Sequence, residues 1–426
     1  MSKTTLTLAL LTLVSLCSAP AGAAEGVLEG MPDPAVLQGP DGRYYIFATG
    51  QGLPVYRSDD LVTWERIDRV FDTPVPAWAK KAIPETEGIW APDVVKFNDK
   101  YYVYYCVSSF GSQRSVMGVA VNTTLDPAAA GYKWTDLGLV IESFPGKDDF
   151  NAIDIAAFQD TDGKAYAVWG SHWGGIKFAA IDPATGKLLG DKPEFTTVAA
   201  RPDTSSRAIE GAYLVQKLGW YYLFVSFDSC CSGAESTYKV MVGRSKSVAG
   251  PYVDFNDKSM AQGGGTLVLA NNDNWRGPGH NSVLQAKQGD FLVHHTYDTC
   301  RLDKQRILQI RPIYWTDDQW PVVGEPISET NPVTTEPVKF AAKALEGSWR
   351  MSNDYGQETI IDLIPRGRIA NHRRATWAVS GNTLMLTWPG EADAAWIDRC
   401  VIEPSGQSFI GRNQTGVVIR GTKICP

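Results

Sequence analysis

The chain has 426 residues, of which 44% are hydrophobic and 20% charged, and this balance excludes an intrinsically disordered protein. Its formal net charge of -7 argues against nucleic acid as a partner, because phosphate binding needs a basic face. The length predicts either a large domain followed by a small one or a single large repeat architecture.

Residues 1–24 have the pattern of a secretory signal peptide. Lys3 supplies the positive start, Leu6 to Leu16 form a short apolar core, and small residues at Ala23 and Ala24 permit cleavage. The apolar core is too short to span a membrane, and no later segment is a candidate. We therefore expect a secreted or periplasmic protein that makes no membrane contact.

Five segments of the chain repeat one pattern, in which a polar residue and an apolar stretch precede a turn and a strongly aromatic strand. The segments are MPDPAVLQGPDGRYYIFATG, WAPDVVKFNDKYYVYYCVS, NAIDIAAFQDTDGKAYAVWGS, AIEGAYLVQKLGWYYLFVSF and GPGHNSVLQAKQGDFLVHHTYD. The pairs Asp41-Gly42, Asn98-Asp99 and Asp162-Gly163 are hairpin signals between these strands. Each repeat thus contributes a hairpin and a third or fourth strand, with no helix between. The pattern predicts an all-β fold, a five-bladed β-propeller over residues 25–330.

The leading polar residues of the five repeats align as Asp33, Asp93, Asp154, Glu210 and His280. If the repeats are blades, these side chains occupy equivalent places on the five innermost strands and converge near one mouth of the central channel. An isolated acid of this kind is usually a turn or strand-edge residue. Burying like charges together destabilises the fold, so a protein keeps such a cluster where its function requires it. Several acids in one register therefore favour a functional site.

Converging carboxyl groups suit glycoside hydrolysis, which needs one protonated acid and one ionised base. A third acid nearby raises its neighbour's pKa by repulsion and keeps that neighbour protonated near neutral pH. A central channel would hold the two groups on opposite walls. A separation of roughly 6.5–9.5 Å leaves room for a water molecule and predicts inversion of configuration.

The segments PDPAV, NAIDIAAF and AIEGAYL, in this order, resemble glycoside hydrolase family 43. The likeness extends through WAPDV, FDSCCSG, STYKVMVGRSKSVAGPY and GPGHNSV, which resemble the endo-α-1,5-L-arabinanases of that family. This resemblance implies that Asp33 is the general base and Glu210 the general acid. It also implies that Asp154 orients Glu210 and raises its pKa.

The same resemblance implies several binding residues. His280 matches a histidine that these arabinanases place beside a metal ion in the channel, usually calcium, with waters as the other ligands. The alternative is a histidine that only hydrogen-bonds a catalytic carboxylate. Trp90 and Phe110 match positions that line the sugar cleft, and packing between blades is their alternative. Asp93 is expected either to bind substrate hydroxyls or to pair with a neighbouring blade, and Asn151 is a further candidate for substrate binding.

Two further histidines, His294 and His295, alternate on one strand, so at most one of them faces the axis. We interpret both as structural. The adjacent Cys230 and Cys231 permit a vicinal disulfide, which would be strained.

The C-terminal part of the chain has a different character. Residues 331–340 read as a linker, and alternating runs such as ETIIDLI and TLMLTWPG predict a small β-barrel or sandwich over residues 341–426. A bridge between Cys400 and Cys425 is expected to close this domain. It could bind polysaccharide, wall part of the cleft or stabilise the propeller.

The expected function is therefore inverting hydrolysis of α-1,5-L-arabinofuranosidic bonds by an endo-acting monomer, with plant arabinan or arabino-oligosaccharides as substrate. An α-L-arabinofuranosidase or β-xylosidase of the same family would use the same acids in a closed pocket. An invertase-like propeller would retain configuration. A non-catalytic carbohydrate-binding propeller would have no need of acids in three motifs.

Overall fold

A computed structural model describes residues 30–301, 305–333, 338–370, 372–390 and 394–424. The predicted signal peptide lies outside these residues. The described part contains five sheets that follow one another along the chain and a closed barrel. None of its helices is long and apolar enough to cross a membrane.

The five sheets are the blades of the predicted propeller, and each is built from consecutive strands. The first blade comprises β1 (Ala35–Gln38), β2 (Tyr44–Phe47), β3 (Pro54–Ser58) and β4 (Glu65–Arg69). The second comprises β5 (Trp90–Phe97), β6 (Lys100–Val107), β7 (Ser115–Asn122) and β8 (Thr135–Ser143). The third comprises β9 (Ala156–Gln159), β10 (Ala165–Trp169), β11 (Ile176–Asp182), β12 (Lys187–Leu188) and β13 (Thr196–Ala199).

The fourth blade comprises β14 (Ile209–Lys217), β15 (Trp220–Phe227), β16 (Lys239–Ser245) and β17 (Thr266–Leu269). The fifth comprises β18 (Trp275–Ala286), β19 (Gly289–Asp298), β20 (Ile307–Trp315) and β21 (Pro321–Val323). Short helices lie outside the sheets: α1 (Ala77–Ala82) and the 3-10 turns Gly233–Glu235 and Met260–Gln262. The three predicted hairpin turns fall between the first two strands of their blades.

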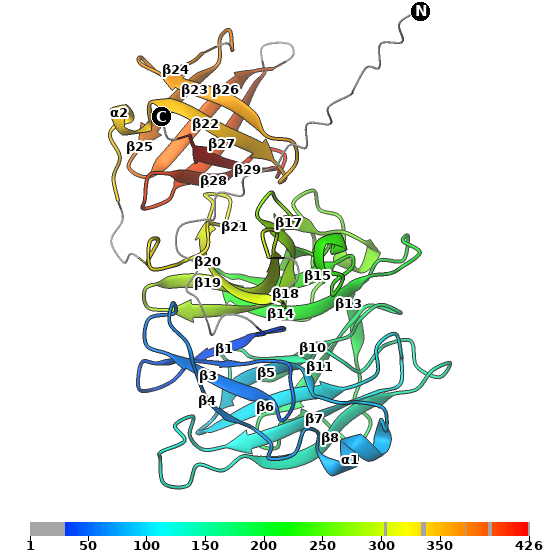
Figure 1. Cartoon of the computed structure of the whole chain (residues 1–426). Helices are drawn as coiled ribbons and strands as arrows, with labels where there is room; N and C mark the ends of the chain where they lie inside the picture. Colours follow the sequence, from blue (N-terminus) through cyan, green and yellow to red (C-terminus); the bar gives the residue numbers. More distant parts are fainter. Residues whose placement is uncertain (1–29, 302–304, 334–337, 371, 391–393, 425–426) are drawn as a thin grey trace, which may run out of the picture.

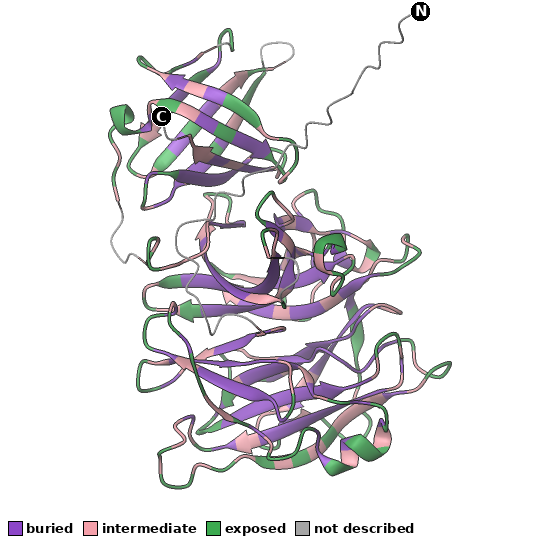
Figure 2. Ribbon diagram, in the orientation of Figure 1, coloured by how far each residue is buried: buried purple, intermediate pink, exposed green. Residues whose placement is uncertain are grey.

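The inner strands β1, β5, β9, β14 and β18 form a closed ring in which each contacts the next and β18 contacts β1. The hydroxyl of Ser282 on β18 donates to the carbonyl of Pro34 (2.7 Å), which joins the last blade to the first. The hydrophobic core lies between the blades, in five clusters that each combine residues of two neighbouring sheets. Figure 2 shows this burial along the strands, whereas α1 and the connecting loops are largely exposed.

The aromatic strands of the repeats supply much of this core. All residues of β2 are buried, because its two faces pack against different neighbouring blades. A fully buried apolar side chain such as Phe47 contributes about 1.5–3 kcal/mol relative to an exposed one. The aromatic repeats therefore explain both the strand propensity and the stability of the ring.

The C-terminal domain is a barrel, the first of the two predicted forms. It follows helix α2 (Ala342–Leu345) and contains β22 (Gly347–Asn353), β23 (Thr359–Ile364), β24 (Arg368–Ile369), β25 (Thr376–Ser380), β26 (Thr383–Pro389), β27 (Ala395–Ile402), β28 (Ser408–Asn413) and β29 (Val418–Lys423). Cys400 is a free, buried thiol, so the expected bridge to Cys425 is wrong for this residue, and Cys425 lies outside the described residues. Cys230 and Cys231 form the vicinal disulfide that the sequence permitted.

The barrel packs against the propeller beside β17 and β21 (Figure 1). Buried Arg412 of β28 donates to the carbonyls of Leu267 (2.6 Å) and Pro321 (2.8 Å) on these two strands. Arg420 of β29 pairs with Glu325 at 2.8 Å. Buried hydrogen bonds and a partly buried ion pair therefore connect the two domains.

Candidate active site

Each blade has a residue with a positive φ angle in its inner strand or two residues before it: Asp33 (54°), Ala91 (42°), Asp154 (61°), Gly211 (57°) and His280 (49°). Strand β18 contains a second such residue, Gly277 (60°). Among residues other than glycine this conformation is uncommon, although Asn, Asp and His adopt it more often than the rest. It persists where the surrounding structure enforces it, often at functional sites. The shared φ angle defines the structural register of the five blades.

The predicted register is correct for Asp33, Asp154 and His280 but wrong for Asp93 and Glu210. Asp93 follows the equivalent residue Ala91 by two positions, and Glu210 precedes Gly211. The pairing of β5 and of β14 with their neighbours shifts at these points, as β-bulges do. A bulge changes which side chains face the channel, and alignment of polar residues could not detect it.

Asp33, the predicted base, is a buried carboxylate surrounded by donors and positive groups. The hydroxyl of Thr49 donates to its Oδ2 (2.5 Å), and its Oδ1 lies 3.3 Å from Nδ1 of His280 and 3.7 Å from the guanidinium of Arg306. Burial alone would raise the pKa of Asp33. The charges of His280 and Arg306 outweigh this effect and hold the pKa well below its usual value. Asp33 is therefore ionised at neutral pH, as a general base must be.

His295, interpreted from the sequence as structural, contacts Asp33. The backbone N–H of Asp33 donates to Nδ1 of His295 (3.1 Å), and the same nitrogen lies 3.3 Å from Oδ1 of Asp33. Burial lowers the pKa of His295 to about 4, so its ring is neutral at pH 7. Nδ1 of His294 instead lies 2.9 Å from the backbone carbonyl of His295. The alternation along the strand was a usable signal, since it allowed one of the two rings to face the axis.

Asp154 is the carboxyl group of the cluster whose pKa is raised. Burial is the largest cause, the charge of His280 opposes it, and repulsion from Glu210 and Asp33 adds to it, giving a value of about 7. The N–H of Gly211 donates to its Oδ2 at 3.4 Å. These interactions place Asp154 beside both other acids. Whether Asp154 raises the pKa of Glu210 stays a prediction.

Glu210, the predicted acid, is held by two hydroxyl groups. Ser171 donates to its Oε2 (2.7 Å) and Tyr238 to its Oε1 (2.9 Å). Sequence reasoning assigned no role to either donor, although Tyr238 lies in the STYKVMVGRS segment that resembles the family. Both carboxylate oxygens are thus fixed before any substrate binds.

The structure brings Asp33, Asp154, Glu210 and His280 together and places the other predicted residues differently. Oδ2 of Asp93 accepts the backbone N–H of Ala157 on β9 (2.7 Å), which is the pairing between blades that the sequence left open. The side-chain oxygen of Asn151 accepts from the hydroxyl of Ser115 (2.6 Å) inside the protein. Substrate contacts by Asp93 and Asn151 stay predictions.

The two predicted cleft aromatics also differ from each other. Trp90 is half-buried against the hydrophobic cluster between the second and third blades, so packing is part of its role. Phe110 follows β6 in a loop and is 85% exposed. A ring with this exposure is free to stack on a sugar. Sugar stacking by either residue stays a prediction.

The predicted calcium ion would depend on His280. Among the described residues, no group of three or more His, Cys, Asp or Glu side chains is arranged to hold a metal ion. Calcium takes six to eight oxygen ligands, and His280 offers only nitrogen. The protein groups present therefore do not form a calcium site by themselves, and we derive no chemical step through the ion.

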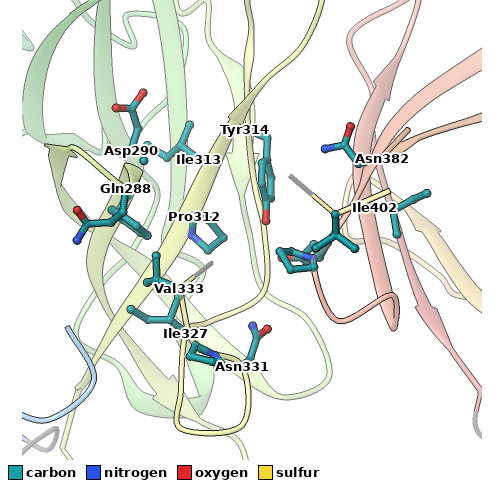
Figure 3. A pocket seen from close by; sticks show the side chains of 16 residues that line it. Gln288, Asp290, Pro312, Ile313, Tyr314, Ile327, Asn331, Val333, Asn382 and Ile402 are labelled. Atoms are coloured by element: carbon teal, nitrogen blue, oxygen red, sulfur yellow. The ribbon is translucent and has the colours of Figure 1, made fainter. Parts of the chain in front are cut away.

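Two cavities lie in very different places. A small axial cavity of about 20 Å³, lined among others by Asp93, Asp154, His280 and Asn281, has room for one water molecule. A larger one of about 270 Å³ lies between the fifth blade and the barrel. Figure 3 shows Tyr314 facing it from the propeller and Ile402 from the barrel. None of the three clustered acids lines the larger cavity, so it is not the catalytic site.

A five-bladed propeller with three carboxyl groups and two histidines at its axis defines the class of propeller glycoside hydrolases. The chain belongs to glycosyl hydrolases family 43, whose sequence model matches residues 25–321. The resemblance stated from the motifs is thereby confirmed.

Two relatives and one solved structure extend this result. The chain is 39% identical over 321 residues to an extracellular exo-α-(1→5)-L-arabinofuranosidase of Cellvibrio japonicus, with 74% of this chain and 91% of the relative covered. It is 38% identical over 315 residues to an extracellular endo-α-(1→5)-L-arabinanase of Bacillus subtilis, with 72% and 93% covered. An endo-1,5-α-L-arabinanase structure from Thermotoga petrophila, 24% identical, covers 94% of this chain and 99% of its own with a TM-score of 0.77. That likeness supports the two-domain fold.

Proposed function

We propose that this protein is an inverting glycoside hydrolase that cleaves α-1,5-L-arabinofuranosidic bonds within arabinan. The observation that carries the proposal is the meeting of Asp33, Asp154 and Glu210 at the propeller axis. The family supports this choice of substrate, and so do the names of the two relatives, an exo-α-(1→5)-L-arabinofuranosidase and an endo-α-(1→5)-L-arabinanase. Ionised Asp33 suits the role of base, and the two hydroxyl groups that contact Glu210 fix the position of the proposed acid.

The reaction is a single displacement. Asp33 accepts a proton from water while the water oxygen forms a bond to the anomeric carbon. The bond between that carbon and the leaving oxygen breaks, and Glu210 donates its proton to the leaving oxygen. Attack from the face opposite to the leaving group inverts the anomeric configuration. Asp154 contacts no reacting atom in this scheme and positions Glu210.

The test compares the wild-type protein with Asp33→Asn, Asp154→Asn and Glu210→Gln variants on debranched linear arabinan. We expect each substitution at Asp33 or Glu210 to lower kcat by at least about 10³-fold, and nuclear magnetic resonance of the first product to show the inverted anomer. A product that retains the anomeric configuration, or full activity in Asp33→Asn or Glu210→Gln, would refute the mechanism.

Exo cleavage is the second candidate, because the Cellvibrio relative is named as an exo-acting enzyme. Loops at the ends of the cleft decide between the two modes. Chromatography of early products separates them: a ladder of oligosaccharides supports endo cleavage, and a single short product from the first minutes supports exo cleavage.

We also propose secretion and a monomeric state. Both relatives are named extracellular enzymes, which supports export. Detection of the protein without residues 1–24 in culture medium or periplasm tests secretion, and light scattering tests the oligomeric state. Calcium beside His280 stays a prediction from the family resemblance.

A further inference from the structure

A pair of stacked aromatic rings lies beneath the carboxyl cluster. The rings of Tyr238 and His295 have centroids 6.0 Å apart and planes inclined by 17°, and both side chains are fully buried. Tyr238 immediately precedes β16 in the fourth blade, and His295 belongs to β19 in the fifth. The pair therefore connects two blades at the axis.

Each ring also holds one of the two catalytic candidates. The hydroxyl of Tyr238 donates to Oε1 of Glu210 (2.9 Å), and Nδ1 of His295 accepts the backbone N–H of Asp33 (3.1 Å). Glu210 lies in the fourth blade and Asp33 at the start of the first. A continuous chain of contacts thus runs from acid to base across three blades.

Gly279 makes the close approach of these rings possible. It lies opposite His295 in the pairing of β18 with β19. A Cβ atom at Gly279 would lie 2.2 Å from the ring of Tyr238, which is too close for two carbon atoms that are not bonded. The backbone of Gly279 has an ordinary φ angle, so the requirement for glycine here is steric. The fifth blade therefore leaves space for the Tyr238 ring at the point where Gly279 pairs with His295.

The hydrogen-bonding groups of both rings are suited to positioning. Burial and the charges of Glu210 and Asp154 raise the pKa of Tyr238, so its hydroxyl remains a donor. Nε2 of His295 is buried and has no hydrogen-bond partner among the described residues. The useful polar atom of the His295 ring is therefore Nδ1, which accepts the N–H of a base whose own backbone has a positive φ angle.

We propose that Tyr238 and His295, packed over Gly279, form one positioning element that fixes Glu210 relative to Asp33. This inference rests on the roles proposed for those two acids. Inversion requires the base, one water and the sugar to fit between the walls of the channel, and a misplacement of about 1 Å costs on the order of 10²-fold in rate. Neither Tyr238 nor His295 needs to touch the substrate for this role.

The experiment uses the full chain with Tyr238→Phe, His295→Phe and the double variant, and His294→Phe as the matched control. His294 is a neighbouring, equally buried histidine outside the contact chain. Kinetics are measured on linear arabinan and on a nitrophenyl arabino-oligosaccharide, whose leaving group needs no protonation. Circular dichroism and thermal unfolding confirm that each variant folds.

For Tyr238→Phe we expect kcat on arabinan to fall about tenfold with KM little changed, and a smaller loss on the nitrophenyl substrate, because the change acts through the acid. For His295→Phe we expect about a 10²-fold loss on both substrates and partial recovery with azide, a nucleophile that needs no base. His294→Phe should remain within about twofold of wild type.

The double variant decides whether the rings act as one element. A combined loss clearly smaller than the product of the single losses supports the proposal, and a simple product refutes it. Equal losses in His295→Phe and His294→Phe would also refute it. If His295→Phe does not fold, His295→Asn replaces it: its amide oxygen can accept the Asp33 N–H, and it must lose less activity than His295→Leu. Full activity in Asp33→Asn or Glu210→Gln would instead overturn the proposed catalytic roles.

Discussion

Replacement of Asp93 by asparagine removes a buried carboxyl group and keeps an oxygen that can accept the N–H of Ala157. Burial raises the pKa of Asp93 to about 7, against an ordinary value of 3.8, and the N–H groups of Ala157 and Val94 only partly oppose this. Among the described residues, Asp93 has no ion-pair partner within 4.0 Å. Its carboxyl group is therefore protonated in the folded protein at mildly acidic pH.

The pKa difference between the folded and unfolded states sets the size of the effect. Between pH 4 and 7 the folded state holds a proton on Asp93 that the unfolded state has lost, so the free energy of unfolding falls as pH rises. One proton corresponds to about 1.4 kcal/mol per pH unit, and about three pKa units give a loss of about 4 kcal/mol by pH 7. The contribution of protonated Asp93 to the free energy of unfolding is therefore fully present below about pH 4 and lost above about pH 7. The Asp93→Asn variant has no such loss.

Guanidinium unfolding of wild type and variant at several pH values between 4 and 8 measures this difference. We expect the variant to gain stability over wild type steadily from pH 4 to 7, with no further gain above that range. Parallel pH profiles for the two proteins would refute the reasoning about Asp93. Activity measured alongside should stay within about threefold of wild type, since the hydrogen bond to Ala157 is kept; a large rise in KM would instead assign Asp93 to substrate binding.

Four other predictions concern different parts of the molecule. Thr49→Val removes the hydroxyl donor of Asp33, so the pKa of Asp33 should rise and the acidic limb of kcat/KM should move to higher pH by about one unit. Phe110→Ala should leave the free energy of unfolding within about 0.5 kcal/mol and raise KM for arabinan several-fold, as measured by denaturation and kinetics. Arg412→Met should separate the unfolding of barrel and propeller into two calorimetric transitions, because it removes two of the buried hydrogen bonds between them. Treatment with a chelator tests the calcium implied by the family resemblance: a loss of activity that calcium restores in wild type but not in His280→Ala supports the ion, and unchanged activity contradicts it.

The propeller was predictable because its signals repeat. Aromatic strands and turns such as Asp41-Gly42 recur in each blade, and five copies of a weak pattern become a strong one. Two of the three clustered acids, Asp33 and Asp154, fell into the correct register for the same reason.

The parts that sequence reasoning missed depend on backbone detail and long-range contact. The bulge in β5 places Ala91, and not Asp93, in register with Asp33. The prolines that follow both Asp33 and Ala91 were a usable signal for that alignment. His295 lies 262 residues from Asp33, and no local pattern reveals that its nitrogen accepts the Asp33 N–H. The expected bridge at Cys400 rested only on proximity in sequence, and the barrel buries this thiol among apolar side chains instead.

The seat of the barrel beside β17 and β21 has a consequence for solubility. These are the outermost strands of the fourth and fifth blades, and an uncovered strand of this kind offers unpaired backbone groups to other chains. The barrel buries Val322 of β21 against Ile410 and Val418. A propeller truncated after the fifth blade would present this apolar margin to solvent and should self-associate, even with its catalytic centre intact.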